Sequence, residues 1–176
     1  MKKTVLIISI IFIAWIVSVH AFADEVIIKM NMLTEKGMGK EIGTVTATDT
    51  QHGLLLVPLL SDLTPGLHGF HIHQNSDCGP AMKEGKSVAG LAAGGHYDPS
   101  NTGKHEGPYS QGHLGDLPVL YAGPDGKATL PVLAPRLKVS DIKDRTLMIH
   151  SGGDNYSDQP EKLGGGGPRY ACGVVK

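Results

Sequence analysis

The segment GFHIH, residues 69–73, has the period-two pattern of a β-strand. Residues two apart on a strand project from the same face, so His71 and His73 share one face while Ile72 enters the core. The same alternation predicts further strands at residues 26–32, 44–48, 54–57, 128–132, 147–150 and 170–175. Turn signals separate them at residues 64–66, 123–126 and 152–155. No amphipathic helix competes with these strands, and their spacing predicts an all-β, antiparallel sandwich or barrel.

The composition fits one small domain of this kind. The chain has 176 residues, 40% of them hydrophobic and 19% charged, which is enough for one core. The 24 glycines, 11 prolines and 5% aromatic residues suit short strands and long ordered loops, and they exclude a coiled coil. The net charge of −1 is spread without blocks of either sign, so no nucleic-acid partner is expected.

The first residues have the pattern of a cleavable secretory signal peptide. Lys2 and Lys3 precede an apolar run over residues 5–19, and small residues surround the expected cleavage site before Asp24. An uncleaved membrane anchor is the alternative, but the run is shorter than the roughly 20 apolar residues that span a bilayer. We therefore expect residues 1–23 to be removed, leaving an exported domain of residues 24–176 with no membrane attachment.

The two cysteines, Cys78 and Cys172, are interpreted in the light of this export. An even pair of cysteines in an exported protein favours a disulfide, and two buried free thiols are the alternative.

Two segments, residues 75–117 and 151–168, lack sustained alternation and are rich in glycine, proline, aspartate and histidine. Loops of this length without secondary structure are uncommon in a compact domain unless they carry a function, are disordered or hold a ligand.

The first long loop contains a set of residues with the chemistry of a zinc site. His96, His105, His113 and Asp116 follow one another at spacings of nine, eight and three residues. Three imidazole nitrogens and one carboxylate oxygen form a tetrahedral zinc set, and four protein ligands would make the site closed and structural. The alternative is a group of unrelated loop histidines.

A second set comes from the strands. His150 ends the predicted strand at 147–150 and can join His71 and His73, and an all-imidazole site suits copper. On its own, the His-x-His pair at 71 and 73 is a weak signal, because such a pair on an exposed strand is often a solvated face. His68 is interpreted as a structural hydrogen-bonding residue, and His52 as a turn or surface residue.

These residues together resemble the Cu,Zn superoxide dismutases of the bacterial periplasmic kind. The resemblance rests on GFHIH at 69–73 and GGGGPRYACGVV at 164–175, with LAAGGHYDP at 91–99 and DNYSD at 154–158 adding the bacterial character. It extends from about residue 26 to residue 175. It implies a flattened antiparallel Greek-key β-barrel with two long functional loops, a periplasmic location and dismutation of superoxide to oxygen and hydrogen peroxide.

The resemblance also implies roles for individual residues. The implied copper ligands are His71, His73, His96 and His150, and the implied zinc ligands are His96, His105, His113 and Asp116. His96 would then bridge the two ions and carry a proton during turnover, while the redox-inactive zinc stays structural. Asp154 would link His71 to His105, Arg169 would receive the superoxide anion, and Cys78 would pair with Cys172.

Other functions would leave different residues in place. An exported copper or zinc carrier would also be rich in histidine, but it would need neither Arg169 as an anion guide nor a bridging ligand. A zinc hydrolase would need an open zinc position and a nearby base, for which Glu106 is the local candidate. A blue-copper protein is disfavoured because its cysteine ligand would break the expected disulfide. The sequence does not decide between a monomer and a homodimer.

Overall fold

The computed structural model describes residues 24–176, so the signal peptide expected at residues 1–23 lies outside the described residues. The strands are β1 (Glu25–Thr34), β2 (Gly37–Thr50), β3 (Gly53–Leu60), β4 (Gly66–His68), β5 (Phe70–His73), β6 (Ala81–Lys83), β7 (Lys86–Val88), β8 (Leu120–Ala122), β9 (Val132–Ala134), β10 (Thr146–His150) and β11 (Arg169–Val174). One short α-helix, α1 (Val139–Ile142), and two 3₁₀ turns, η1 (Leu91–Ala93) and η2 (Lys162–Gly165), complete the described elements. The predicted all-β class is confirmed.

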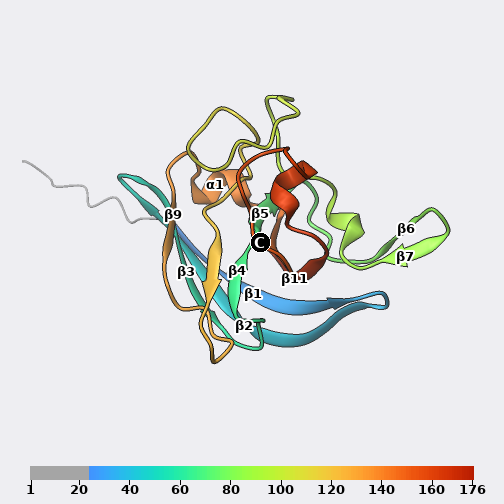
Figure 1. Ribbon diagram of the computed structural model, residues 1–176. Helices are drawn as coiled ribbons and strands as arrows, with labels where there is room; N and C mark the ends of the chain where they lie inside the picture. Colours follow the sequence, from blue (N-terminus) through green and yellow to red (C-terminus); the bar gives the residue numbers. More distant parts are fainter. Residues whose placement is uncertain (1–23) are drawn as a thin grey trace, which may run out of the picture.

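Seven strands form one antiparallel sheet in the order β5-β10-β11-β1-β2-β3-β9, and β4–β8 and β6–β7 form separate ribbons. The strands β1, β2 and β3 are successive neighbours, and β11 returns late in the chain to lie beside β1. Such a return of a later strand to the side of the first is the Greek-key arrangement. Figure 1 shows the sheet curled on itself, with the long loops gathered above it.

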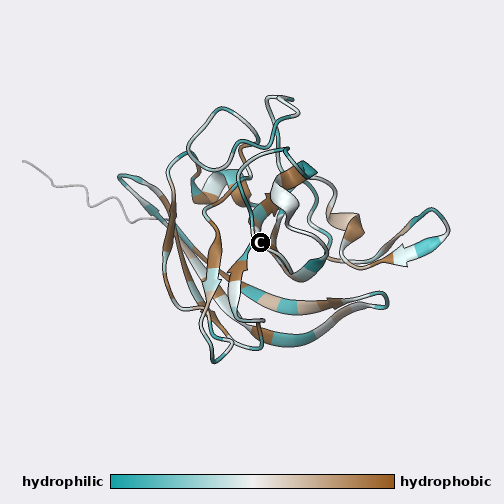
Figure 2. Cartoon of the chain, in the orientation of Figure 1, coloured by the Kyte–Doolittle hydropathy of each residue, from teal (hydrophilic) through white to brown (hydrophobic). Residues whose placement is uncertain are grey.

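The core follows from the alternation along the strands. Along β3, Leu54, Leu56 and Leu60 are buried, while Val57 and Leu59 between them are exposed. Figure 2 shows this alternation as bands of hydrophobic and hydrophilic colour along the long strands. Strands β5 and β10 differ, because every one of their residues is buried. One face of these two strands packs on the core and the other is covered by the long loops.

The strand predicted at residues 128–132 is wrong. Ala128 forms only an isolated bridge with Leu60, and the regular pairing with β3 begins at Val132. Pro131 has no N–H to donate, so an unbroken ladder through this stretch is not possible. The other six predicted strands are present. The three-residue strands β4, β6, β7 and β8 and the helix α1 were not predicted.

The expected disulfide is present, and the alternative of two free thiols is wrong. Cys78 and Cys172 are joined with an S–S distance of 2.05 Å, and both are buried. The bond ties the loop after β5 to the middle of β11. Within residues 24–176, no helix is long and apolar enough to cross a membrane.

Candidate metal centre

The free edge of β5 is the base on which the site is built. On its other edge β5 pairs with β10, with His71 opposite Met148 and His73 opposite Thr146. Its free edge is covered by the first long loop, since Ile72 N donates to Gly115 O and Tyr97 N donates to Ile72 O, both at 2.8 Å. These bonds bring distant segments of the loop to the two strand histidines. Single bridges follow between His73 and His96 and between His71 and Asp116.

The first cluster consists of four buried histidines, whose possible ligand atoms all lie within 4.8 Å of one another: His71, His73, His96 and His150. In two of these histidines Nδ1 already forms a hydrogen bond to a main-chain carbonyl. His73 Nδ1 donates to the carbonyl oxygen of Gly94 at 2.9 Å, and His150 Nδ1 donates to that of Gly167 at 3.0 Å. A neutral imidazole that donates through Nδ1 keeps a lone pair on Nε2. The two Nε2 atoms are 3.4 Å apart, so both lone pairs face one small volume.

The other two histidines each have one nitrogen without a partner. His71 donates through Nε2 to Asp154 Oδ2 at 2.7 Å, and His96 Nδ1 lies 2.9 Å from Asp116 Oδ1. Within residues 24–176, this leaves His71 Nδ1 and His96 Nε2 buried without a hydrogen-bond partner. Buried polar atoms in folded proteins are nearly always paired. A metal ion in the cluster would satisfy both nitrogens, so the residues present fit a metal.

The second cluster surrounds Asp116. His105 Nδ1 lies 3.0 Å from Asp116 Oδ2, and His113 Nδ1 lies 3.4 Å from Asp116 Oδ1. Among the described residues, neither Nδ1 atom has a partner in hydrogen-bond geometry, although both are buried. A metal ion bound between these atoms would satisfy both buried nitrogens. The set whose ligand atoms all lie within 4.8 Å of one another holds His71, His96, His105 and Asp116, so the predicted member His113 stands slightly outside it.

Asp154 connects the two clusters, as the resemblance implies. Its Oδ2 accepts from His71 Nε2 at 2.7 Å and its Oδ1 accepts from His105 Nε2 at 2.8 Å. Such carboxylate contacts fix the tautomer and orientation of a ligand imidazole. Tyr156 N also donates to Oδ1, at 2.7 Å. Gly164 packs against this carboxylate at φ +71°, and a Cβ there would overlap Oδ1, so the position requires glycine.

The charges of the cluster follow from burial. Burial, and then the neighbouring imidazoles, hold the pKa of His71 and His73 well below 6.5, and burial lowers the pKa of His150 to about 4. Burial raises the pKa of Asp116 and Asp154, but contacts with the histidines outweigh it and hold both pKa values below the usual range. At neutral pH the strand histidines are therefore neutral and the two carboxylates charged, which is the state that binds a metal.

The metal-free protein is expected to lose stability as the pH falls from 7 to 5. Four histidines have lower pKa values in the folded state than in the unfolded state: His71, His73, His96 and His150. Their contribution to the free energy of unfolding is therefore present above pH 6.5, and it is lost as the pH falls toward their folded pKa values, about 4 for His150. Burial lowers the pKa of His105, but Asp116 and Asp154 outweigh burial and raise this pKa to about 9. The stability that His105 contributes is therefore complete below pH 6.5, and it does not offset the stability lost through the other four histidines. Equal free energies of unfolding in urea at both pH values would contradict this.

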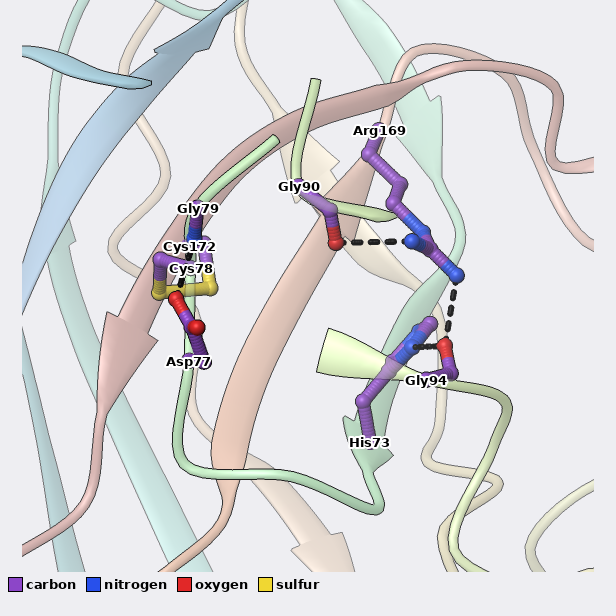
Figure 3. The surroundings of a disulfide bond; sticks show 8 residues. All are labelled: His73, Asp77, Cys78, Gly79, Gly90, Gly94, Arg169 and Cys172. Atoms are coloured by element: carbon purple, nitrogen blue, oxygen red, sulfur yellow. Dashed lines mark hydrogen bonds between the residues drawn. A yellow bond between two sulfur atoms is a disulfide. The ribbon is translucent and has the colours of Figure 1, made fainter. Parts of the chain in front are cut away.

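Arg169 is held beside the first cluster. It is the register partner of His150 across β10 and β11. Its guanidinium donates through Nη1 to Gly90 O at 2.7 Å and through Nη2 to Gly94 O at 2.6 Å. Figure 3 shows that Gly94 O also accepts from His73, so one carbonyl joins the arginine to the cluster. Both glycines belong to the loop that the disulfide ties to β11.

The remaining histidines lie where the sequence analysis placed them. His68 is buried, with Nδ1 at 2.7 Å from His150 O and Nε2 at 2.7 Å from Thr64 O, and so it is a structural residue. His52 is exposed in the turn between β2 and β3. Glu106, the candidate base of a zinc hydrolase, is exposed and is a member of neither cluster.

Two residues that support the site were not predicted. Asp158 Oδ2 accepts from the backbone N of His105 at 2.9 Å. Arg136 donates to four carbonyl oxygens of the loop that carries His113. Asp158 ends the DNYSD stretch at 154–158, which contributed to the resemblance without giving this residue a role. Arg136 has no sequence signal beyond its charge, since it lies in a short turn between elements.

The fold and the site define a β-barrel metalloprotein with two adjoining candidate metal sites that share His71 and His96. A family model described as copper/zinc superoxide dismutase (SODC) matches residues 41–175. The chain belongs to this family.

Individual relatives agree with the family match. The protein named superoxide dismutase [Cu-Zn] 2 of Salmonella typhimurium is 62% identical over 150 residues, which cover 85% of this chain and 87% of the relative. The structure of the Cu/Zn superoxide dismutase from Brucella abortus matches with a TM-score of 0.86 at 53% identity, covering 87% of this chain and all of that one. The solution structure of a monomeric copper, zinc superoxide dismutase from Salmonella enterica matches with a TM-score of 0.79 at 60% identity, with 87% of this chain covered and 100% of that chain.

Proposed function

We propose that the two clusters form the copper and zinc sites of an enzyme that converts two superoxide anions and two protons into oxygen and hydrogen peroxide. The family membership supports the reaction and both metals as cofactors. The observation that carries the proposal is the pair of buried, unpartnered nitrogens, His71 Nδ1 and His96 Nε2, within the four-imidazole cluster. A metal-storage protein would not need a second site that shares a ligand with the first.

The nitrogens without hydrogen-bond partners among the described residues support a choice of ligands for each metal. Copper would be held by His71 Nδ1 and by the Nε2 atoms of His73, His96 and His150, an all-imidazole set that suits this metal. Zinc would be held by a set of three imidazoles and one carboxylate, namely His96, His105, His113 and Asp116. His96 is the residue common to both sets, with Nδ1 toward Asp116 and Nε2 left for copper.

The chain's own residues hold the proton and orient the ligands. When bound, copper supplies the one-electron oxidation and reduction that the reaction needs, and zinc supplies a fixed positive charge. His96 Nε2 would hold one of the two protons of hydrogen peroxide while it is not bound to copper, since its ring stays anchored through Nδ1 beside Asp116, and water would supply the other proton. Asp154 keeps His71 and His105 oriented while that proton moves.

Arg169 is the residue that receives the anion. Its two carbonyl bonds aim the guanidinium from the disulfide-tied loop toward the first cluster. A guanidinium has five N–H donors, so donors remain for a small anion. The chain's net charge is −1, and loss of Lys2 and Lys3 with the signal peptide makes the net charge −3. Because a negative protein repels an anionic substrate, the positive charge of Arg169 is needed close to the site.

Replacing Arg169 with alanine is expected to lower kcat/KM for superoxide about tenfold and to weaken its dependence on ionic strength, since local steering charge is lost. The copper and zinc contents should not change. Stopped-flow superoxide decay at increasing salt, with metal analysis of the same samples, measures both. Loss of copper together with activity would make Arg169 a structural residue instead.

The protein acts outside the cytoplasm in this proposal, as a periplasmic domain of residues 24–176 released by cleavage before Asp24. Its lysine-led apolar N-terminus supports this. Mass spectrometry of the protein from a periplasmic extract gives the cleavage site.

The solution structure of a relative is described as monomeric, which supports a monomer for this chain, with a homodimer as the alternative. Sedimentation of the metal-loaded protein decides between the two.

The activity is tested by assaying superoxide dismutation with the metal-free, zinc-only and copper-plus-zinc forms, with metal content measured in each. Activity only in the form that contains copper is expected. A protein that holds one copper and one zinc yet has no activity would instead be the exported copper and zinc carrier.

A further inference from the structure

The segment that joins His105 to His113 has no regular secondary structure, yet it places both imidazoles. Its tip is exposed at Tyr109, while Gly107 and Pro108 on one limb and Gly112 on the other are buried. The base of the loop is closed by His113 N, which donates to Lys104 O at 2.9 Å. Above that bond, the carbonyl oxygens of the two limbs turn toward the same side chain.

That side chain is Arg136, which binds both limbs at once. On the first limb, Nη2 donates to Gly107 O at 3.2 Å and Nε donates to Pro108 O at 2.9 Å. On the second limb, Nη1 donates to Gly112 O at 3.1 Å and Nη2 donates to His113 O at 2.6 Å. A rigid, planar fork of donors is the property of arginine that allows four such bonds in one geometry.

Arg136 is itself fixed to the sheet. It lies in the turn between β9 and α1, two residues after Ala134, which is paired with Leu54 of β3. The turn is closed by Leu137 N, which donates to Ala134 O at 3.3 Å, and the side chains of Ala134 and Leu137 are buried. In Figure 1 the olive loop before β8 arcs above this orange turn. Arg136 thus links a loop without regular secondary structure to a turn that is fixed to the sheet.

We propose that Arg136 is a positioning residue for the zinc site, which holds the loop so that His105 Nδ1 and His113 Nδ1 face Asp116 before the metal arrives. Its four hydrogen bonds go to main-chain carbonyls, including that of His113, and so it would act through the backbone of the loop. This inference rests on the zinc ligand set proposed above. Because the loop is already ordered, zinc binding does not have to supply the free energy of ordering it.

Arg136→Met is expected to lower zinc affinity between about 10-fold and 100-fold, the range found when the groups that orient metal ligands are removed. Arg136→Lys keeps the charge and the stem but lacks the fork, so it should recover little of the affinity. Zinc affinity is measured by competition with a chelator. Co(II) at the same site gives a second readout, because a loosened ligand set weakens the visible absorption of the tetrahedral ion.

Arg145→Met is the matched control. Arg145 also donates to two main-chain carbonyls, Asp141 O and Gln74 O, each at 3.0 Å, and both lie outside the loop of residues 107–113. If the effect of Arg136 is general destabilisation, both methionine variants should lower the melting temperature and neither should change zinc affinity more than about threefold. A change in zinc affinity and cobalt spectrum confined to the Arg136 variants supports the proposal.

The proposal is overturned if Arg136→Met keeps zinc affinity within about twofold of the unchanged protein, or, should that variant fail to fold, if Arg136→Lys does. His113→Ala separates this failure from failure of the ligand set. If His113→Ala binds zinc normally, the proposed zinc ligands are wrong. If it loses zinc while the Arg136 variants do not, only the role of Arg136 is wrong.

Discussion

Replacing His150 with alanine is expected to lower superoxide dismutation at least about 100-fold, more than is lost when a group that merely orients a ligand is removed. His150 supplies one of four imidazoles to the copper set, and its Nε2 lies only 3.4 Å from the Nε2 of His73 in the same set. The backbone of residue 150 should stay in place, because its N donates to Gly69 O at 2.8 Å and its O lies 2.7 Å from His68 Nδ1. Copper content should fall with the activity.

Zinc content should stay nearly unchanged in the same variant, because His150 is not a member of the cluster around Asp116. His52→Ala is the matched control: it removes an exposed histidine from the β2–β3 turn and should change neither metal nor activity. Full activity with copper retained in the His150 variant would remove His150 from the copper set. Parallel loss of both metals would mean that the two sites do not load independently.

The strands were predictable where one face meets the core and the other meets water. Alternation locates β1, β2 and β3, whose exposed and buried residues follow one another along the chain. It also locates β5, although both of its faces are buried, because His71 and His73 take the polar positions of the pattern. In β10 three apolar residues are consecutive, and His150 is the polar residue that ends the run. The alternation fails at residues 128–132, since hydropathy does not register that Pro131 lacks an N–H.

The short strands could not be predicted, because their partners are decided by tertiary packing. Strand β4 is three residues long and pairs with β8, which lies more than fifty residues later. Neither has enough residues to show a period. The same applies to Arg136, whose four acceptors lie 23 to 29 residues earlier in the sequence and are main-chain atoms that any residue type would provide.

The site was predictable as a set of residues but not as an arrangement. Residue type and spacing indicate imidazoles and carboxylates, and the resemblance divides them between two metals. Only the fold shows that β5 lends its free edge to the first long loop and so brings His96 between His73 and Asp116. The position of His113 at the margin of its cluster also depends on side-chain geometry that no spacing rule contains.

The double variant Cys78→Ala/Cys172→Ala is expected to lower the free energy of unfolding by about 4–5 kcal/mol, because the lost cross-link spans 94 residues of sequence and no longer restricts the unfolded chain. Both sulfur atoms lie in a small buried cluster with Ala93 and Met148, so the alanines add some loss of packing. Urea unfolding of the metal-free variant and of the metal-free unchanged protein measures the difference.

The reduced form of the unchanged protein is the control, since it lacks the cross-link but keeps both side chains. It should account for most of the loss, and any further loss in the double variant measures packing alone. A difference below about 1 kcal/mol between the oxidised and reduced forms would contradict the cross-link argument. The disulfide also fixes the loop whose Gly90 and Gly94 carbonyls hold Arg169, so reduction should lower kcat/KM even under conditions in which the metal-loaded protein stays folded.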